Sequence, residues 1–552
     1  MVDQILSTFE GTETKVVGYA DDIMILVPGT DPDTMVQIMN KNIRKIESWG
    51  SENGLMFNPD KTVAVHFTFA RKLRWQEVKV GGKLIEYSTD MKYLGVTLQQ
   101  KLSWGKHVTD KVKKATKVMC LANAVTGQRW GLNPERILWV YTAMVRPVAT
   151  YGSVVWAHDI PTSIIQKLNG LQRRALLCMG NPMRSTPTAG MEAALGLIPL
   201  DIYAKGLARK TRLRTRKGKE QWVSRLKKKG HRQNLDRDLE EIGALEGPLD
   251  SEPGVRSFIT NEKVENPQVL IYTDGSCTEG VTGCGFVSTD GENVLAEEAT
   301  YLGTSSSAFQ AEVTAIERAL IWATQELGEG SKVTIRTDCS AAISSLLSTK
   351  STSVTVNSCK RYLRKAKENL LIALEWVKAH SGDTLNEHAD SLAKSAARTK
   401  AAGPEPFLPR PAENIKKLVT RLSLREWQER WTATADCRQS RELCPRVSTE
   451  KLHSLVTLGK HQINLLFQGV TGHALLANHL SKWHNMEDLC GLCLEHEESM
   501  AHILNECPAL QGLRDELDQE ESQGEERILR ILNHETVVEL MAERGHSIAE
   551  PA

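Results

Sequence analysis

Four acidic residues of this chain occupy positions where a carboxylate is costly unless it is paired or bound to a cation. Asp274 lies near the end of the apolar segment VLIYTDGS, at a turn made by Gly275, and Asp338 ends the segment KVTIRTD. Glu312 lies on or beside the apolar stripe of a predicted helix. Asp390 lies in the first turns of another predicted helix, where the macrodipole favours an anion. These positions indicate a shared cation site.

The residue types indicate which cation and which reaction. Carboxylates that converge on one sheet would repel each other in the absence of metal. Two Mg²⁺ ions about 4 Å apart would neutralise them and would hold both the attacking water and the leaving oxygen of a phosphodiester. Ligand sets made only of oxygen suit Mg²⁺ or Mn²⁺. The constellation therefore predicts metal-dependent hydrolysis of a phosphodiester.

Elements that could position these groups follow one another over residues 269–398. The pattern predicts three strands, a helix, a strand, two helices, a strand and a final helix. The first of these helices is expected to begin after Ser305–Ser307, which are good N-cap residues, and to run to about Thr324. Its apolar stripe has helical spacing and consists of Phe309, Val313, Ile316 and Leu320.

Four motifs in this order resemble the ribonuclease H family: YTDGS (272–276), FQAEVTAI (309–316), IRTDCSAAI (335–343) and WVKAHSGDTLNEHADSLAK (376–394). The resemblance implies a domain at 266–400 with a mixed five-stranded sheet and helices, which cuts the RNA strand of an RNA–DNA hybrid. It implies that the four carboxylates bind two Mg²⁺ or Mn²⁺ ions. It also implies that His380 transfers a proton at the scissile phosphate, which suits the pKa of an imidazole.

One departure from the family concerns substrate binding. Between Asp338 and His380 there is little room for the extra basic helix with which some members bind the hybrid. We expect the hybrid to be held instead by neighbouring domains or by a basic group of four residues. That group consists of Lys360, Arg361, Arg364 and Lys365.

The tetrad Tyr19-Ala20-Asp21-Asp22 lies between two apolar segments and predicts a tight hairpin. Helical spacing follows at 34–53, and strand character returns at 53–67 and 93–98. The hairpin resembles the catalytic hairpin of a reverse transcriptase palm. The segments GLMFNPDKT, YLGVTL, VRPVATYGSVVW and TPTAGMEAALGLIPL resemble the regions that follow it in jockey-like non-LTR retrotransposons. The chain thus resembles the C-terminal portion of such a polyprotein.

Nucleotide transfer needs a third metal-binding carboxylate on an earlier strand. Upstream of Tyr19 the sequence offers Asp3, Glu10 and Glu13, with no strand motif around them. We therefore expect Asp21 and Asp22 to be vestigial and reverse transcriptase activity to be absent from this chain.

Near the C-terminus, Cys490, Cys493, His502 and Cys507 have the ligand types and spacing of a structural zinc site. Thiolates favour Zn²⁺ over Mg²⁺. His496 could replace His502, although His502 is better placed at the start of a predicted helix. Two further histidines, His473 and His479, are expected to be structural.

Length, composition and charge distribution indicate how the chain is divided into domains. A chain of 552 residues with 41% hydrophobic and 25% charged residues is typical of a multidomain globular protein. Between Lys205 and Arg232 thirteen Lys or Arg residues accompany one acid, Glu220, in a basic block that could contact phosphates or form a solvated linker. The expected parts are a partial palm (1–104), a helical thumb or connection region (105–215), a charged linker (216–265), the nuclease (266–400) and a helical zinc-binding region (401–552).

Neither a secretory signal nor an apolar run of membrane-spanning length is evident in the sequence. The eleven cysteines are scattered apart from the C-terminal group, which favours a reducing, intracellular compartment, with nucleus and cytoplasm both open. The expected partners are an RNA–DNA hybrid and other proteins of the element, with no membrane. Two alternative functions stay open: a non-catalytic nucleic-acid-binding relic, and a polymerase subunit completed by the missing upstream sequence.

Overall fold

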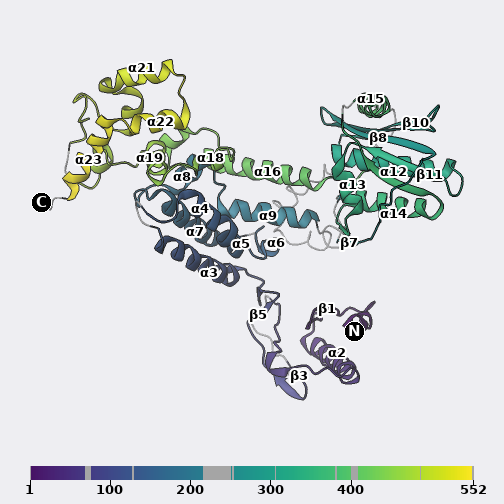
Figure 1. Ribbon diagram of the computed structural model, residues 1–552. Helices are drawn as coiled ribbons and strands as arrows, with labels where there is room; N and C mark the ends of the chain where they lie inside the picture. Colours follow the sequence, from purple (N-terminus) through teal and green to yellow (C-terminus); the bar gives the residue numbers. More distant parts are fainter. Residues whose placement is uncertain are drawn as a thin grey trace. The chain divides into compact units, whose positions relative to one another are not determined.

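The chain forms two compact units in the computed structural model. Figure 1 shows the model coloured along the sequence, from purple at the N-terminus to yellow at the C-terminus. One unit comprises Met1–Ala204 together with Trp427–Ala552, and the other comprises Lys205–Glu426. None of the helices described has the length and apolarity that a membrane span requires. The residues described are 2–68, 76–126, 130–158, 160–214, 250, 254–304, 306–379, 382–399, 408–484 and 487–549.

The predicted hairpin near the N-terminus is confirmed. Strands β1 (Lys15–Tyr19) and β2 (Asp22–Leu26) pair antiparallel with Tyr19 opposite Asp22. Ala20 lies in the left-handed region at φ +53°, as a two-residue hairpin turn requires. The predicted helix also forms, as α2 (Pro32–Glu52).

The strand predicted over 53–67 is wrong. Asn58 caps a 3₁₀ turn, Pro59–Lys61, by accepting the backbone N–H of Asp60, and Pro59 has no N–H to donate to a sheet. Beyond this turn the chain forms two short antiparallel pairs. Their strands are β3 (Val78–Val80) with β4 (Lys83–Ile85), and β5 (Asp90–Tyr93) with β6 (Val96–Gln99).

Helices dominate the rest of this unit, as the sequence predicts for 105–215. They are α1 (Val2–Ser7), α3 (Gly105–Ala124), α4 (Pro134–Val140), a π-turn (Tyr141–Val145), α5 (Arg146–Ala149), α6 (Ser153–Trp156), α7 (Thr162–Gly180), α8 (Thr188–Leu195) and α9 (Leu200–Arg214).

The C-terminal helices pack against this helical region rather than forming a separate body. A side chain at Gly180 of α7 would come within 2.8 Å of the Phe467 ring, so glycine permits the close approach. The C-terminal helices of this unit are α17 (Arg438–Leu443), α18 (Leu452–Leu455), α19 (Lys460–Thr471), α20 (Ala477–Leu480), α21 (Gln511–Gln519), α22 (Gly524–Leu532) and α23 (Glu535–Ala549), with a π-turn at His502–Glu506 and a 3₁₀ turn at Pro508–Leu510. Helices α9 and α16 (Ala412–Ala433) each extend from one unit into the other.

The second unit contains the predicted mixed five-stranded sheet, with strand order β10-β9-β8-β11-β13. Strand β9 pairs antiparallel with both β8 and β10, whereas β11 runs parallel to both β8 and β13. The strands are β8 (Val269–Thr278), β9 (Val281–Thr289), β10 (Val294–Gly303), β11 (Lys332–Thr337) and β13 (Leu371–Trp376).

Helices cover both faces of this sheet (Figure 1). One face packs against α15 (Thr384–Arg398), and the other packs against α12 (Ala308–Glu326), with α13 (Ser340–Leu347) and α14 (Val354–Asn369) beside it. The predicted stripe of α12 is confirmed, since Val313, Ile316 and Leu320 are fully buried and Phe309 packs against the same core.

Part of the predicted linker belongs to this unit. Strand β7 (Val255–Arg256) pairs with β12 (Lys350–Ser351), and the side-chain amide of Asn261 bonds both the N–H and the carbonyl of Leu374 on edge strand β13. Asp250 accepts the backbone N–H of Thr355 at the start of α14. The unit therefore begins before residue 266. The remainder of the predicted linker, 216–249, and most of the basic block lie outside the described residues.

Candidate functional site

Two of the predicted carboxylates lie side by side because of the strand register. The parallel pairing of β8 with β11 ends at Thr273 and Thr337, so Asp274 and Asp338 follow at the same edge of the sheet. Asp274 is 7% exposed. The end of this parallel pairing thus brings together two acids that are 64 residues apart in the sequence.

Glu312 reaches this edge from the second turn of α12. The helix begins at Ser307, whose hydroxyl accepts the N–H of Gln310, while the Gln310 side chain accepts the N–H of Ser307. A methyl group on Gly275 would overlap the backbone nitrogen of Glu312, so only glycine allows strand and helix to approach so closely. Ligand oxygens of Asp274, Glu312 and Asp338 lie within 4.8 Å of one another.

Burial and repulsion between carboxylates favour the protonated forms of Asp274 and Glu312. Burial, followed by the charges of Asp338 and Asp390, raises the pKa of Asp274 to about 7. Burial, followed by the charge of Asp274, raises the pKa of Glu312 to about 9. Oε2 of Glu312 is buried and has no hydrogen-bond partner among the described residues. A divalent cation fits such a site, because it would supply both the missing partner and the opposite charge.

The fourth predicted ligand lies apart from the other three. Asp390 Oδ2 is 2.6 Å from the ammonium group of Lys394, one turn further along α15. Its charge still raises the pKa of Asp274 and of Glu312. The structure thus brings three carboxylates together and pairs the fourth with a lysine. The predicted proton-transfer residue, His380, lies outside the described residues.

Two residues at this site were not singled out from the sequence. Trp376 ends β13, is 54% exposed, and donates its indole N–H to the backbone carbonyl of Asp338 at 2.9 Å. Lys394 neutralises Asp390. The motif WVKAHSGDTLNEHADSLAK contains both residues, and the four-residue spacing of Asp390 and Lys394 is a detectable signal of a helical ion pair.

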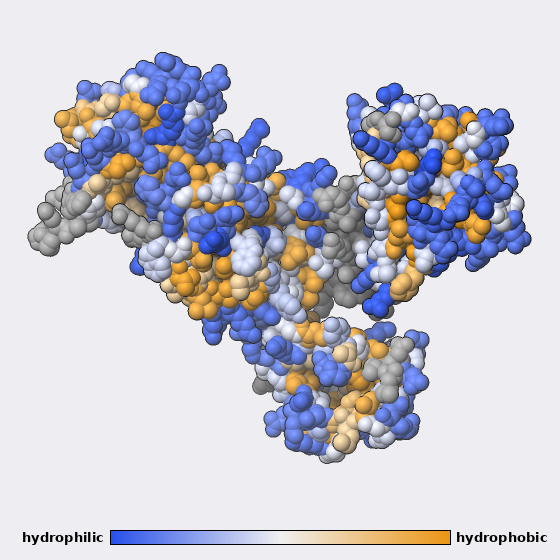
Figure 2. Space-filling view, viewed as in Figure 1, coloured by the Kyte–Doolittle hydropathy of each residue, from blue (hydrophilic) through white to orange (hydrophobic). Residues whose placement is uncertain are grey.

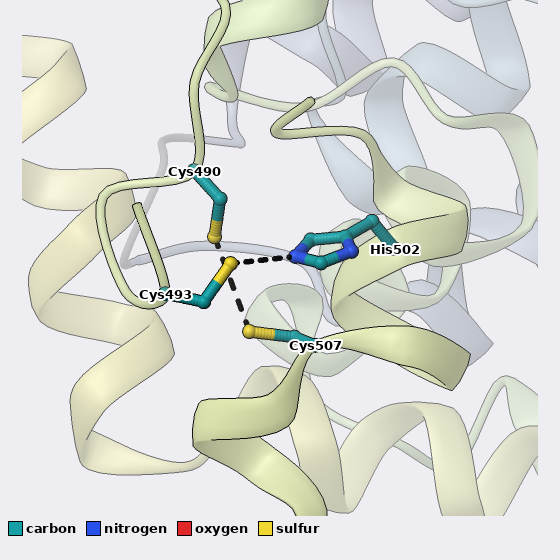
Figure 3. Close-up of side chains that lie close together, drawn as sticks. All are labelled: Cys490, Cys493, His502 and Cys507. Atoms are coloured by element: carbon teal, nitrogen blue, oxygen red, sulfur yellow. Dashed lines mark hydrogen bonds between the residues drawn. The ribbon is translucent and has the colours of Figure 1, made fainter. Parts of the chain in front are cut away.

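The C-terminal cluster of three cysteines and one histidine forms as predicted (Figure 3). Sγ of Cys490 lies 3.9 Å from Sγ of Cys507, and Sγ of Cys493 lies 3.3 Å from Nε2 of His502. Tetrahedral zinc with bonds of about 2.3 Å to sulfur separates two thiolates by about 3.8 Å. The spacing of the sulfur atoms therefore fits zinc.

Local backbone geometry explains why these four residues meet. Cys490 and Cys493 lie on a tight knuckle closed by the bond from Leu494 N–H to the carbonyl of Cys490. His502 and Cys507 lie at the two ends of a π-turn, in which the N–H of Cys507 bonds the carbonyl of His502 at 2.8 Å. His496 stacks on His502 at 5.4 Å but does not belong to the cluster.

The thiol environments differ in a way that suits a metal site. Burial raises the pKa of Cys507 to about 11 and also raises the pKa of Cys490. Burial also opposes ionisation of Cys493, but hydrogen bonds from the backbone of Glu495 and His496 outweigh it and lower that pKa to about 6. Cys493 is therefore the thiol that ionises first, and a bound cation would favour ionisation of the other two.

A buried ion pair, which sequence reasoning missed, supports the knuckle. Glu498 is fully buried, bonds Nη2 of Arg544 at 2.8 Å and accepts the N–H of Gly491 within the knuckle. Ala477 donates a further backbone N–H to the same carboxylate. His473 and His479, which the sequence analysis expects to be structural, both contact the Ser185 hydroxyl, and their ring centroids lie 4.5 Å apart.

Asp21 and Asp22 lie exposed on the N-terminal hairpin. Within the described part of the chain, no third acidic, histidine or cysteine side chain joins them in a metal-binding group.

Comparison with protein families identifies two regions. Residues 266–398 match the ribonuclease H family, and residues 1–98 match the reverse transcriptase (RNA-dependent DNA polymerase) family.

Curated relatives come from retrotransposons. The chain is 27% identical over 202 residues to a 115 kDa protein of the type-1 retrotransposable element R1DM of Drosophila melanogaster, which covers 36% of this chain and 20% of the relative. It is 23% identical over 204 residues to a Pol polyprotein of the type-1 element R1 of Nasonia vitripennis, covering 36% and 60%. It is 24% identical over 164 residues to the RNA-directed DNA polymerase of the mobile element jockey of Drosophila funebris, covering 30% and 18%. The matches thus span between about a fifth and three fifths of these relatives.

Solved structures with similarity include ribonuclease H1 of Halobacterium salinarum, at 22% identity and a TM-score of 0.20, covering 23% of this chain and 96% of that one. LC11-RNase H1 in complex with an RNA/DNA hybrid has the same identity, coverage and TM-score. The chain contains a ribonuclease H domain and a reverse transcriptase segment, and its homologues are polyproteins of R1- and jockey-type non-LTR retrotransposons.

Proposed function

We propose that this chain hydrolyses the RNA strand of RNA–DNA hybrids with the help of two Mg²⁺ or Mn²⁺ ions. The observation that carries the proposal is the unpartnered, buried Oε2 of Glu312 beside Asp274 and Asp338 in a domain that matches ribonuclease H. A site built only to stabilise the fold would not leave this oxygen without a hydrogen bond.

Each residue has a role in this reaction. Asp274, Glu312 and Asp338 would hold the metal ions, and Asp390 would join them as the fourth ligand. Bound Mg²⁺ ions activate the attacking water and stabilise the leaving oxygen. Trp376 holds the backbone of Asp338 in place. We assign to His380 the transfer of a proton at the scissile phosphate, for which an imidazole is suited.

The test is cleavage of a labelled RNA–DNA hybrid by the full chain with Mg²⁺. Asp274→Asn should lose cleavage, whereas the matched control Asp290→Asn should retain it, because Asp290 lies on the β9–β10 turn and its amide replacement can still accept the backbone N–H groups there. A wild-type chain that cuts no hybrid with Mg²⁺ or Mn²⁺, or an Asp274→Asn variant that cuts normally, refutes the proposal. Hybrid binding without cutting would instead favour a non-catalytic relic.

For the C-terminal cluster we propose a structural Zn²⁺ held by Cys490, Cys493, His502 and Cys507. Closed four-ligand sites of this kind stabilise a fold and leave no open position for chemistry. The spacing of the sulfurs and the ionisable Cys493 thiol support the proposal.

Metal analysis of the purified full chain tests the zinc proposal. The wild type should contain about one Zn per chain, as a single four-ligand site requires. Cys493→Ser should lose the metal, and Cys120→Ser, at an exposed cysteine of α3, should retain it. A folded wild-type chain that contains no zinc after purification in zinc-supplemented buffer contradicts the assignment.

A further inference from the structure

Charge is distributed unequally on the two flanks of the catalytic carboxylates. Helix α14 carries five cationic residues and one acidic residue, Glu368. On the other side, edge strand β10 and the turn before it carry four acids and no cation: Asp290, Glu292, Glu297 and Glu298. Glu297 contacts His388, and Glu298 pairs with Arg318. A polyanion that reaches the carboxylates would therefore be attracted at α14, whereas β10 offers it no cation.

Two of the five cationic side chains on α14 donate hydrogen bonds to backbone carbonyls of the same unit. Lys360 is 1% exposed and donates to the carbonyl of Ser348, so the sequence-based expectation that it contacts substrate is wrong. Lys367 donates to the carbonyl of Thr260. Three cations are left for solvent.

These three, Arg361, Arg364 and Lys365, have the spacing of one helical face and are all exposed. None of them forms a hydrogen bond or ion pair with another described residue. Burial raises the pKa of the neighbouring Glu317, and the charge of Arg361 opposes this effect. Figure 2 shows hydrophilic residues gathered over α14 on the face in view. Unpaired exposed cations on one face are typical of a surface that contacts phosphates.

These three residues, the basic stripe of α14, also lie close enough to the carboxylates for one duplex to contact both. Helices α12 and α14 run side by side in the same direction, since Gln310 contacts Thr355 at their starts and Gly330 bonds Asn369 at their ends. Glu312 is two residues from Gln310. At 1.5 Å per residue, Arg361 to Lys365 lie about 9–15 Å along α14 from Thr355, within reach of a duplex bound over the carboxylate edge.

We infer that the stripe Arg361, Arg364 and Lys365 binds the sugar–phosphate backbone of the hybrid. The inference rests on the proposed ribonuclease H function and adds the surface that holds its substrate. The stripe spans about 6 Å of helix, which matches about two phosphates of one strand at an axial spacing of about 3.4 Å. Such contacts fix the position of a duplex without reading its sequence.

The test compares two triple variants of the full chain with equal charge change. Arg361→Gln/Arg364→Gln/Lys365→Gln should raise KM for the hybrid about tenfold with kcat unchanged. It should also lower the slope of log affinity against log salt by about 2, one unit for each of the two phosphates contacted. The control Lys263→Gln/Lys332→Gln/Arg398→Gln, whose residues lie off α14, should leave KM and the salt slope as in the wild type.

The outcomes separate this inference from the proposed function. If the wild type cleaves and the α14 variant keeps the wild-type KM and salt slope, the stripe is not the binding surface, although the nuclease assignment survives. If the wild type does not cleave, the function fails, and hybrid binding measured by fluorescence anisotropy decides the stripe: equal affinity of both variants overturns it. The variant Arg361→Lys/Arg364→Lys keeps the charge and should keep the affinity; a loss there would refute a phosphate role.

Discussion

Replacing Glu312 with glutamine should stabilise the metal-free ribonuclease H domain and remove most of its stabilisation by Mg²⁺. The carboxyl group is 9% exposed, and its Oε2 has no hydrogen-bond partner among the described residues. Burial and the neighbouring Asp274 raise its pKa from 4.5 to about 9. Glutamine has nearly the shape of the protonated carboxyl and carries no charge, so the variant removes the repulsion and keeps the packing.

The size and pH dependence of the effect follow from proton linkage. In the unfolded chain Glu312 ionises above pH 4.5, whereas in the folded domain it holds its proton until about pH 9. Unfolding therefore releases a proton between these values, and the stability of the wild type falls as pH rises through this window. At pH 7 the lost stability is about 3 kcal/mol, and at pH 5 it is under about 1 kcal/mol. The stability advantage of Glu312→Gln over the wild type should therefore grow as pH rises from 5 to 7.

Hydrogen exchange of the α12 and β8 amides in the full chain, corrected for intrinsic rates, measures this stability at pH 5 and pH 7. In EDTA the variant should be the more protected at pH 7, and Mg²⁺ at a hundred times its Kd should protect the wild type by about 2.7 kcal/mol. Glu326→Gln, at the exposed end of the same helix, is the matched control and should change neither quantity. A Glu312→Gln variant that is less protected than the wild type in EDTA, or equally stabilised by Mg²⁺, would refute the reasoning.

Three further changes probe the same domain. Trp376→Phe keeps an aromatic ring but removes the N–H that bonds the carbonyl of Asp338; kcat should fall about fivefold, for a bond worth about 1 kcal/mol, and more Mg²⁺ should be needed for half-maximal cleavage. Asp250→Ala removes the acceptor of the Thr355 N–H at the start of α14, where Ser353 is the N-cap, and should reduce protection of that amide by about 1–2 kcal/mol in hydrogen exchange. Gly275→Ala should abolish cleavage because the added methyl group overlaps α12, whereas Gly328→Ala, which meets no atom within 4 Å, should be tolerated in the same assay.

The elements of the nuclease sheet could be predicted because each has a regular apolar pattern. The stripe that ends at Leu320 on α12 is one example. The segment around Asn261 could not be predicted in this way, because it attaches to edge strand β13 through a side-chain amide and leaves no apolar periodicity. Similarly, Asp250 accepts an N–H at the start of a helix that lies more than a hundred residues further along the chain, and no local sequence pattern indicates such a contact.

Within the site, Asp338 and Glu312 were predictable because Asp338 follows a strand and Glu312 lies on the buried side of a helix. The turn predicted at Gly275 is wrong: β8 continues to Thr278, and Asp274 lies where its pairing with β11 ends. The role of Trp376 was not predictable, since its bond to Asp338 depends on the parallel register of β11 with β13, which aligns Thr337 with Trp376. The position of Asp390 was predicted on α15, but its pairing with Lys394 moves it out of the tight group.

Ligand spacing alone left a choice between His496 and His502 at the C-terminal cluster, and the backbone geometry favours His502 as the ligand in the proposed site. In an α-helix two residues five apart point about 140° away from each other, so His502 and Cys507 could not share a metal. The π-turn between them adds one residue to the turn and brings both side chains to the same side. Such turns are rare and less favourable than α-helix, and they persist where another interaction compensates. A shared cation supplies that interaction, because it bonds the two ends of the turn to the knuckle at Cys490 and Cys493. The geometry of this turn therefore supports the proposed zinc site.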